Sequence, residues 1–273
     1  MNELFDHPAF QGGVAPLVIA LVVGFALART RFAWLAIVAG YVTMVGLTVG
    51  FSFTPLTVAR KTILLGLLAP VIGIAADMLP RPSRAIAPAL ALIAGAASLW
   101  VFQTILQQRE LSAALVAGTG VALFVAVLVG STIRLREYGL RGGAAGLGLG
   151  LATGIAGLLS ASIGYFLAGV AVAASAGAML LVQVVLGRRI APGYTGTLTI
   201  GLLTALFAAG SLMLAELPWY ALPLLLLVPL AVALPAPERM SLIVRAAIFA
   251  VYALVAAAIP ILAAWYAAHG SLT

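Results

Sequence analysis

The sequence contains no cysteine and only two histidines among 273 residues. The lack of cysteine excludes disulfides, thiolate nucleophiles and thiolate-bound iron–sulfur or haem centres. His7 and His269 lie near the two ends, so an apolar span has no histidine pair to ligate a metal or a haem. We therefore expect neither a cofactor nor a metal site.

Charged residues are also scarce. They make up 8% of the chain, whereas hydrophobic residues make up 64%. Soluble domains carry about 25% charged residues, and a globular core cannot hide so much apolar surface from water. The apolar runs are continuous, which excludes the short alternating segments of a membrane β-barrel. The composition predicts an all-α polytopic membrane protein whose main partner is the lipid bilayer.

The net charge of +7 raises the question of nucleic-acid binding. The basic residues stand singly or in pairs at the ends of apolar runs, which is how the orientation of a membrane protein is encoded. Topology therefore accounts for the excess of positive charge, and we expect no nucleic-acid partner.

The longest uncharged stretch, residues 142–187, spans forty-six positions between Arg141 and Arg188. As one helix it would be about 69 Å long. Because the hydrocarbon core of a bilayer is only about 30 Å thick, this stretch must hold two spans. Its most polar and flexible point, Ser160–Gly164, is where we expect the chain to turn.

Apolar runs of sufficient length predict about ten transmembrane helices. They are expected at residues 13–29, 32–51, 62–79, 85–105, 112–133, 142–159, 164–187, 196–215, 218–235 and 245–266.

With ten spans, the basic residues divide unequally between the two sides of the membrane. One side carries eleven of the fourteen: Arg29, Arg31, Arg81, Arg84, Arg134, Arg136, Arg141, Arg188, Arg189, Arg239 and Arg245. The other side carries Arg60, Lys61 and Arg109. Positive loops stay in the cytoplasm. The chain is therefore expected in a bacterial inner (plasma) membrane, with both termini periplasmic or external.

Tryptophan and tyrosine fall near the ends of the predicted spans. We interpret them as interfacial anchors, because their rings and polar tips suit the headgroup level. The outer set is Trp100, Tyr165, Trp219, Tyr220, Trp265 and Tyr266, and the inner set is Trp34, Tyr138 and Tyr194.

A faint internal repeat divides the chain into two five-helix halves, residues 1–138 and 139–273, within a single membrane domain. Residues 53–57 (FTPLT) and 194–199 (YTGTLT) precede the third span of each half, and ADMLP (76–80) and AELP (215–218) follow it. Because five is odd, the second half would enter the membrane from the opposite side. Such inverted repeats are common in secondary transporters, and chance similarity is the alternative.

No carboxylate is expected at the middle of a span, since Asp77 and Glu216 lie at span ends. This argues against a conventional proton antiporter. Polar side chains and helix breaks near the midplane supply instead a candidate substrate path: Tyr41, Thr43, Pro70, Gly73, Ser98, Thr119, Thr204, Gly210, Ser211 and Tyr252. The alternative for each hydroxyl is a bond to its own helix backbone.

Small residues recur at four-residue spacing on the two helices of the uncharged stretch: Gly146, Gly150, Gly154, Gly169, Ala173 and Gly177, with Gly142 before them. This spacing is typical of closely packed membrane helices, and we expect these residues to pack the two helices against each other.

The sequence contains no combination of residues that would make a catalytic site, so we expect no enzymatic activity. The favoured function is a permease or channel for a small neutral or amphipathic solute. The alternative is a non-catalytic subunit that scaffolds a larger membrane complex. The partners would then be the solute in the first case, and other membrane subunits or a second copy of the chain in the second. A solvent-accessible cavity that reaches the midplane would favour the first function, and a filled bundle with one broad apolar flank would favour the second.

Overall fold

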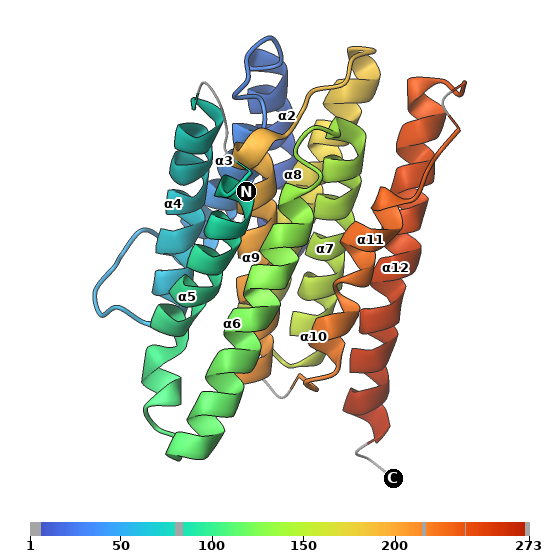
Figure 1. The fold of residues 1–273 in the computed structure, drawn as a ribbon. Helices are drawn as coiled ribbons and strands as arrows, with labels where there is room; N and C mark the ends of the chain where they lie inside the picture. Colours follow the sequence, from blue (N-terminus) through green and yellow to red (C-terminus); the bar gives the residue numbers. More distant parts are fainter. Residues whose placement is uncertain (1–6, 80–83, 215–216, 238, 271–273) are drawn as a thin grey trace.

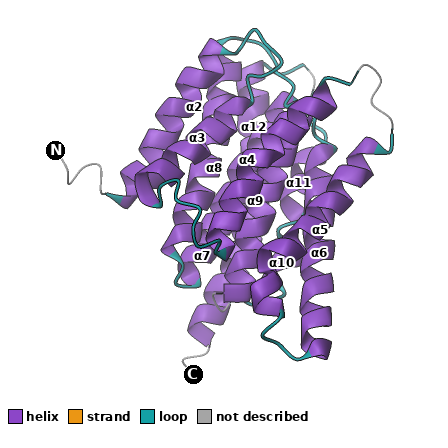
Figure 2. Ribbon diagram, turned by 90° about the vertical axis from the view of Figure 1, so that its left-hand side faces the viewer, coloured by secondary structure: helices purple, strands orange, loops and turns teal. Residues whose placement is uncertain are grey.

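The protein is described by a computed structural model that covers residues 7–79, 84–214, 217–237 and 239–270. Every regular element in these residues is a helix (Figure 2). The helices form a bundle with roughly parallel axes (Figure 1). In chain order they are η1 Phe10–Val14, α2 Ala15–Ala26, α3 Leu35–Thr48, α4 Val58–Asp77, α5 Ile86–Leu106, α6 Leu111–Ile133, α7 Gly139–Leu159, α8 Ile163–Val185, α9 Gly193–Leu214, α10 Ala221–Leu224, α11 Leu227–Ala233 and α12 Leu242–Gly270.

Seven of the described helices are long and apolar enough to cross a membrane: α4 to α9 and α12. The all-helical, multi-pass membrane architecture is therefore confirmed, but the count of ten spans is not. Three predicted spans, 13–29, 32–51 and 218–235, correspond to shorter apolar helices. The ninth is broken into α10 and α11, and each piece contains a proline, Pro223 and Pro229, that cannot donate a helical hydrogen bond.

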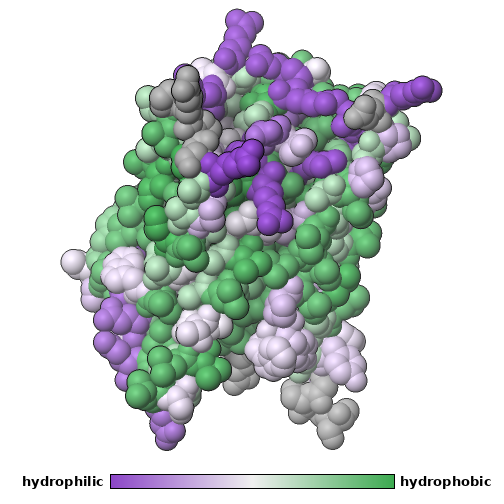
Figure 3. All heavy atoms as spheres, in the orientation of Figure 1, coloured by the Kyte–Doolittle hydropathy of each residue, from purple (hydrophilic) through white to green (hydrophobic). Residues whose placement is uncertain are grey.

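Polar side chains gather mainly at one end of the bundle, above an apolar flank (Figure 3). We call this the basic end: it holds the α2–α3, α6–α7, α8–α9 and α11–α12 connections, which carry most of the arginines. The opposite end holds the α5–α6 connection, the α7–α8 turn and the last turns of α12. The two ends thus reproduce the division of charge between the loops, while the orientation in a membrane stays a prediction.

Helix α9 lies at the centre of the bundle, and 19 of its 22 residues are buried. It packs against α4, α6, α7 and α8, so both halves of the chain contribute to one core. The third helices of the two halves, α4 and α9, are direct neighbours. Other pairs depart from two-fold symmetry, because α12 packs along α7 whereas its counterpart α6 packs along α9. The five-plus-five repeat therefore stays a prediction.

The uncharged stretch folds as a helical hairpin. Helix α7 ends at Leu159 and α8 begins at Ile163, so the turn lies inside the segment where the sequence places it. Ala161 takes a positive φ of 58° in this turn, and the amide of Ser162 closes it by donating to the carbonyl of Gly157 at 2.9 Å.

Glycines let the backbones of α7 and α8 touch along this hairpin. A Cβ added to Gly150 would lie 2.5 Å from the amide nitrogen of Ala173 and 2.7 Å from the carbonyl oxygen of Gly169. A Cβ on Gly169 would collide with the backbone of Gly154. Gly146 faces Ala176 of α8 and Ile200 of α9, whereas Gly177 has only Leu147 within ordinary contact distance. Backbone approach this close maximises dispersion contacts between helices that lipid cannot drive together.

Replacing Gly150 by alanine tests this hairpin. The added methyl group has only backbone atoms to displace, so we expect the free energy of unfolding to fall by roughly 1–3 kcal/mol. Thermal melting in detergent measures the effect. Gly164→Ala is the matched control, because nothing lies within 4 Å of its added Cβ. It should be neutral or gain up to about 1 kcal/mol from helix propensity. Equal melting temperatures for both variants would contradict the close contact.

Candidate functional site: a cavity at one end of the bundle

A cavity of about 1010 Å³ opens at the end of the bundle opposite the basic end. It lies between the last turns of α3, α9 and α12, the first turns of α4 and α8, and the α7–α8 turn. Its deepest residues include Tyr41 on α3 and Phe207 on α9, each seven residues from the end of its helix. At a rise of about 1.5 Å per residue, the cavity reaches roughly 10 Å into the bundle.

Three aromatic rings form the deep part of the cavity. The ring of Phe207 lies 5.9 Å from that of Tyr41 and 6.3 Å from that of Tyr165, measured between centroids. Both pairs are tilted, by 41° and 40°. Gly210, one turn along α9 from Phe207, makes room for this arrangement, because a Cβ there would collide with the Tyr165 hydroxyl. The rings present an apolar surface with phenolic hydroxyls at its edge.

Hydrogen-bonding groups in the cavity are few and uncharged. Thr48, Thr62 and Ser160 line it, but each hydroxyl already donates to a carbonyl one turn back in its own helix, at 2.7–3.0 Å. The hydroxyls of Tyr41 and Tyr165 make no hydrogen bond within the described part of the chain. Tyr41 is only 2% exposed, and its hydroxyl is part of this small accessible surface. No described residue in the lining is charged.

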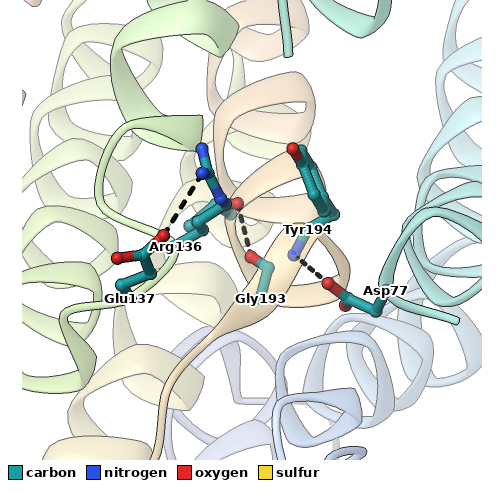
Figure 4. Close-up of polar contacts among 6 residues, drawn as sticks. Asp77, Arg136, Glu137, Gly193 and Tyr194 are labelled. Carbon is teal, nitrogen blue, oxygen red and sulfur yellow. Dashed lines mark hydrogen bonds and ion pairs between the residues drawn. The ribbon is translucent and has the colours of Figure 1, made fainter. Parts of the chain in front are cut away.

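Helices α4 and α9 both border the cavity, and at the basic end a carboxylate joins these two helices. Asp77, the last residue of α4, accepts hydrogen bonds from the first turn of α9 (Figure 4). The amide of Tyr194 donates to Oδ1 at 2.8 Å, and the amide and the hydroxyl of Thr195 donate to Oδ2 at 2.9 and 2.7 Å. These groups satisfy amides that the helix itself leaves unpaired, and the negative charge lies at the positive end of the helix dipole.

Further contacts hold the first turn of α9 at this position. The amide of Gly193 donates to the carbonyl of Arg136 in the α6–α7 connection at 3.0 Å, and the guanidinium of Arg136 lies 5.3 Å from the ring centroid of Tyr194. Gly193 has φ +62°, and a side chain there would run into the Asp77 carboxylate. Below this contact, Gly73 approaches Thr195 so closely that an added Cβ would lie 2.5 Å from its Cα. We call this set of contacts the Asp77 clamp.

Most of the ten predicted path residues lie away from the cavity, and only Tyr41 lines it. Gly210 supports Tyr165 from behind, and Gly73 belongs to the Asp77 clamp. Four hydroxyls are bonded to carbonyls within their own helices at 2.6–3.0 Å: Thr43, Ser98, Thr204 and Ser211. Thr119 bonds its own helix in the same way on an exposed face of α6. Tyr252 is half-buried on α12, with its ring edge-on to Phe249.

The helix breaks predicted near Pro70 and Gly73, and near Gly210 and Ser211, are wrong. Helix α4 continues through Pro70, which is buried inside it, and α9 continues through Gly210 and Ser211. Membrane helices accommodate such residues when neighbours pack against the freed backbone. Neither helix therefore offers an unwound segment to a ligand.

Two residues interpreted as interfacial anchors are instead buried. Trp34 is fully enclosed, with its indole N–H donating to the carbonyl of Ile190 at 3.0 Å, and Tyr194 is 4% exposed beneath Arg136. Tyr165 lines the cavity. Their positions at helix ends are compatible with either role, and tertiary packing decides between them.

Tyr165 and Phe207 were not predicted as cavity residues, and Asp77 was not predicted as a contact between helices. The sequence does contain an indication of the role of Asp77. A carboxylate in the last turn of a helix interacts unfavourably with the helix dipole, so its presence there indicates a compensating partner. Glu216, the corresponding acid of the second half, lies outside the described residues.

Comparison of the chain with protein-family models, curated proteins and solved structures found no match.

The Asp77 clamp predicts a specific loss of stability. In Asp77→Asn the side-chain oxygen can accept a hydrogen bond from only one of the two backbone N–H groups. The side-chain NH₂ group then faces the other N–H group, which loses its acceptor. We expect a loss of about 1–3 kcal/mol, which is the cost of an unpaired buried donor. Thermal melting in detergent measures it.

Glu137→Gln is the control for this substitution, since it also converts a carboxylate to an amide at the basic end. Glu137 pairs with Arg136 at 3.2 Å, but its side chain is 71% exposed. An exposed ion pair contributes only about 0–1 kcal/mol. If Asp77→Asn melted like the wild type, the carboxylate would not be holding α4 to α9.

Proposed function

We propose that this protein is a non-enzymatic permease for a small neutral or amphipathic solute. The observation that carries the proposal is the cavity, which penetrates one end of the bundle while the other end of the same helix pair is closed. A volume of about 1010 Å³ is at the upper end of the range for small-molecule sites. A subunit that only scaffolds a complex has no need of such a cavity.

The lining supports the kind of solute. An ion would lose its hydration without a compensating charge, since no described lining residue is charged. A neutral molecule with an apolar body could lie against Phe207. Its polar group could exchange hydrogen bonds with the hydroxyls of Tyr41 and Tyr165, which have no other partner among the described residues.

The two ends of α4 and α9 support a permease rather than an open channel. The two helices are antiparallel, are held together by the Asp77 clamp at the basic end, and both border the cavity at the other end. A solute bound near Tyr41 would reach the basic end only after α9 moved relative to α4. In alternating access a transporter opens its binding site to one side of the membrane and then to the other, and the present arrangement would correspond to one of these two states. With the basic end in the cytoplasm, the cavity would open to the periplasm or exterior.

Flux through proteoliposomes tests the proposal. The probes are neutral solutes of increasing apolar character: urea, glycerol, butanediol and benzyl alcohol. Their flux is measured by the reswelling of the proteoliposomes after osmotic shock or by the uptake of radiolabelled solute. We expect at least one probe to cross faster than through empty liposomes. Ala168→Trp places an indole in the cavity and should reduce that flux at least tenfold. Ala96→Trp is the control, because Ala96 is exposed on the flank of α5.

The scaffold alternative makes a different prediction. It expects no protein-dependent flux for any probe, equal behaviour of Ala168→Trp and wild type, and stoichiometric co-purification of the chain with other membrane subunits. That combination would overturn the permease proposal.

A further inference from the structure

A second hollow lies on the flank of the bundle, separate from the cavity. It is a groove of about 660 Å³ between α6, α9 and α10. Its walls are almost entirely apolar, and its residues on α6 run from Val116 to Val127. The eleven residue-to-residue steps from Val116 to Val127 correspond to about 16 Å along the helix, or roughly half the thickness of a hydrocarbon core.

The groove exists because the ninth apolar segment is broken. Helix α10 has only four residues, and the chain turns at Leu225 before α11 begins. Gly120 of α6 leaves the groove open, because an added Cβ would have nothing within 4 Å.

Two side chains of interfacial type lie at the mouth of the groove. They are Arg109, in the α5–α6 connection, and Trp219, which is 72% exposed just before α10. Tryptophan at this position marks the headgroup level. The positive charge of Arg109 therefore lies where the apolar groove meets the headgroups.

Among the described residues at the end of the bundle opposite the basic end, Arg109 is the basic side chain that has no hydrogen-bond or ion-pair partner. Arg60 donates to the carbonyl of Pro55 at 2.7 Å, and the ammonium of Lys61 donates to the carbonyl of Trp100 at 3.0 Å. The side chain of Arg109 makes neither a hydrogen bond nor an ion pair within the described part of the chain, although Glu110 follows it. Membrane orientation does not account for this charge either, because the basic end carries most of the arginines.

We propose that this groove binds one diacyl phospholipid, with an acyl chain along α6 and the headgroup phosphate on the guanidinium of Arg109. The guanidinium presents paired N–H donors that match two phosphate oxygens. This proposal concerns a different surface from the solute cavity and does not depend on the transport activity.

The test uses the delipidated full-length chain in detergent and native mass spectrometry. Three probes separate the parts of the ligand: dioleoyl phosphatidylglycerol, dioleoylglycerol without a phosphate, and glycerol phosphate without acyl chains. We expect one phosphatidylglycerol to be retained per chain. The other two probes should bind at least tenfold more weakly.

Two variants separate the phosphate contact from the groove. Arg109→Gln removes the guanidinium from an exposed loop and should weaken phosphatidylglycerol binding at least tenfold. Gly120→Leu fills the groove in open space and should do the same without lowering the melting temperature. Gly13→Leu is the matched control, because its added Cβ also has nothing within 4 Å and it lies outside the groove. It should leave binding unchanged.

Several outcomes would overturn the proposal. Binding that is lost in Gly120→Leu but intact in Arg109→Gln would mean that an apolar chain without phosphate occupies the groove. Equal binding of glycerol phosphate would mean that Arg109 takes a free anion. Phosphatidylglycerol binding that neither Arg109→Gln nor Gly120→Leu reduces would place the lipid elsewhere.

Discussion

The Asp77 carboxylate and the first turn of α9 are the contact on which the arrangement of this bundle depends. Three donors on two consecutive residues, Tyr194 and Thr195, converge on one side chain from the other half of the chain. Because Gly73 brings the same two helices into backbone contact one turn below, α4 and α9 cannot separate at the basic end while the contact persists. At their other ends the two helices border the cavity. The closed end and the open end of the bundle thus both follow from the way the antiparallel helices α4 and α9 are joined at the basic end by the Asp77 contact and the close approach at Gly73.

Small residues provide the rigid surroundings in which that pair can act. The α7–α8 hairpin packs backbone against backbone at Gly150 and Gly169, and α9 lies against it at Gly146. Lipid gives helices no hydrophobic reason to associate, so this close fit replaces the driving force of a soluble core. A hairpin without room for a single methyl group at its centre behaves as one body. Under the proposed permease function, α4 and α9 would move against this body.

The features predicted correctly from the sequence are the local ones. The turn at Ser160–Ser162 follows from the length of an uncharged run and the thickness of a bilayer, and the division of charge follows from the loops. The cavity was not predictable, because Tyr41, Tyr165 and Phe207 come from three helices whose packing no spacing encodes. Mid-span hydroxyls such as Thr204 bond their own helix and need no partner across the bundle. Helix-breaking residues failed as indicators for a related reason, since Pro70 is accommodated inside α4.

Thiol accessibility of two single-cysteine variants tests most directly whether the bundle is open at one end and closed at the other. Ala168 lies five residues into α8 from the cavity end, and Ala144 lies five residues into α7 from the basic end. Both are buried, at 5% and 0% exposure, and the chain has no other cysteine. In detergent a small, neutral, water-soluble methanethiosulfonate reagent reaches both ends of the bundle. The account predicts rapid modification of Ala168→Cys, which lines the cavity, and at least tenfold slower modification of Ala144→Cys. Equal rates, or faster modification of Ala144→Cys, would contradict it.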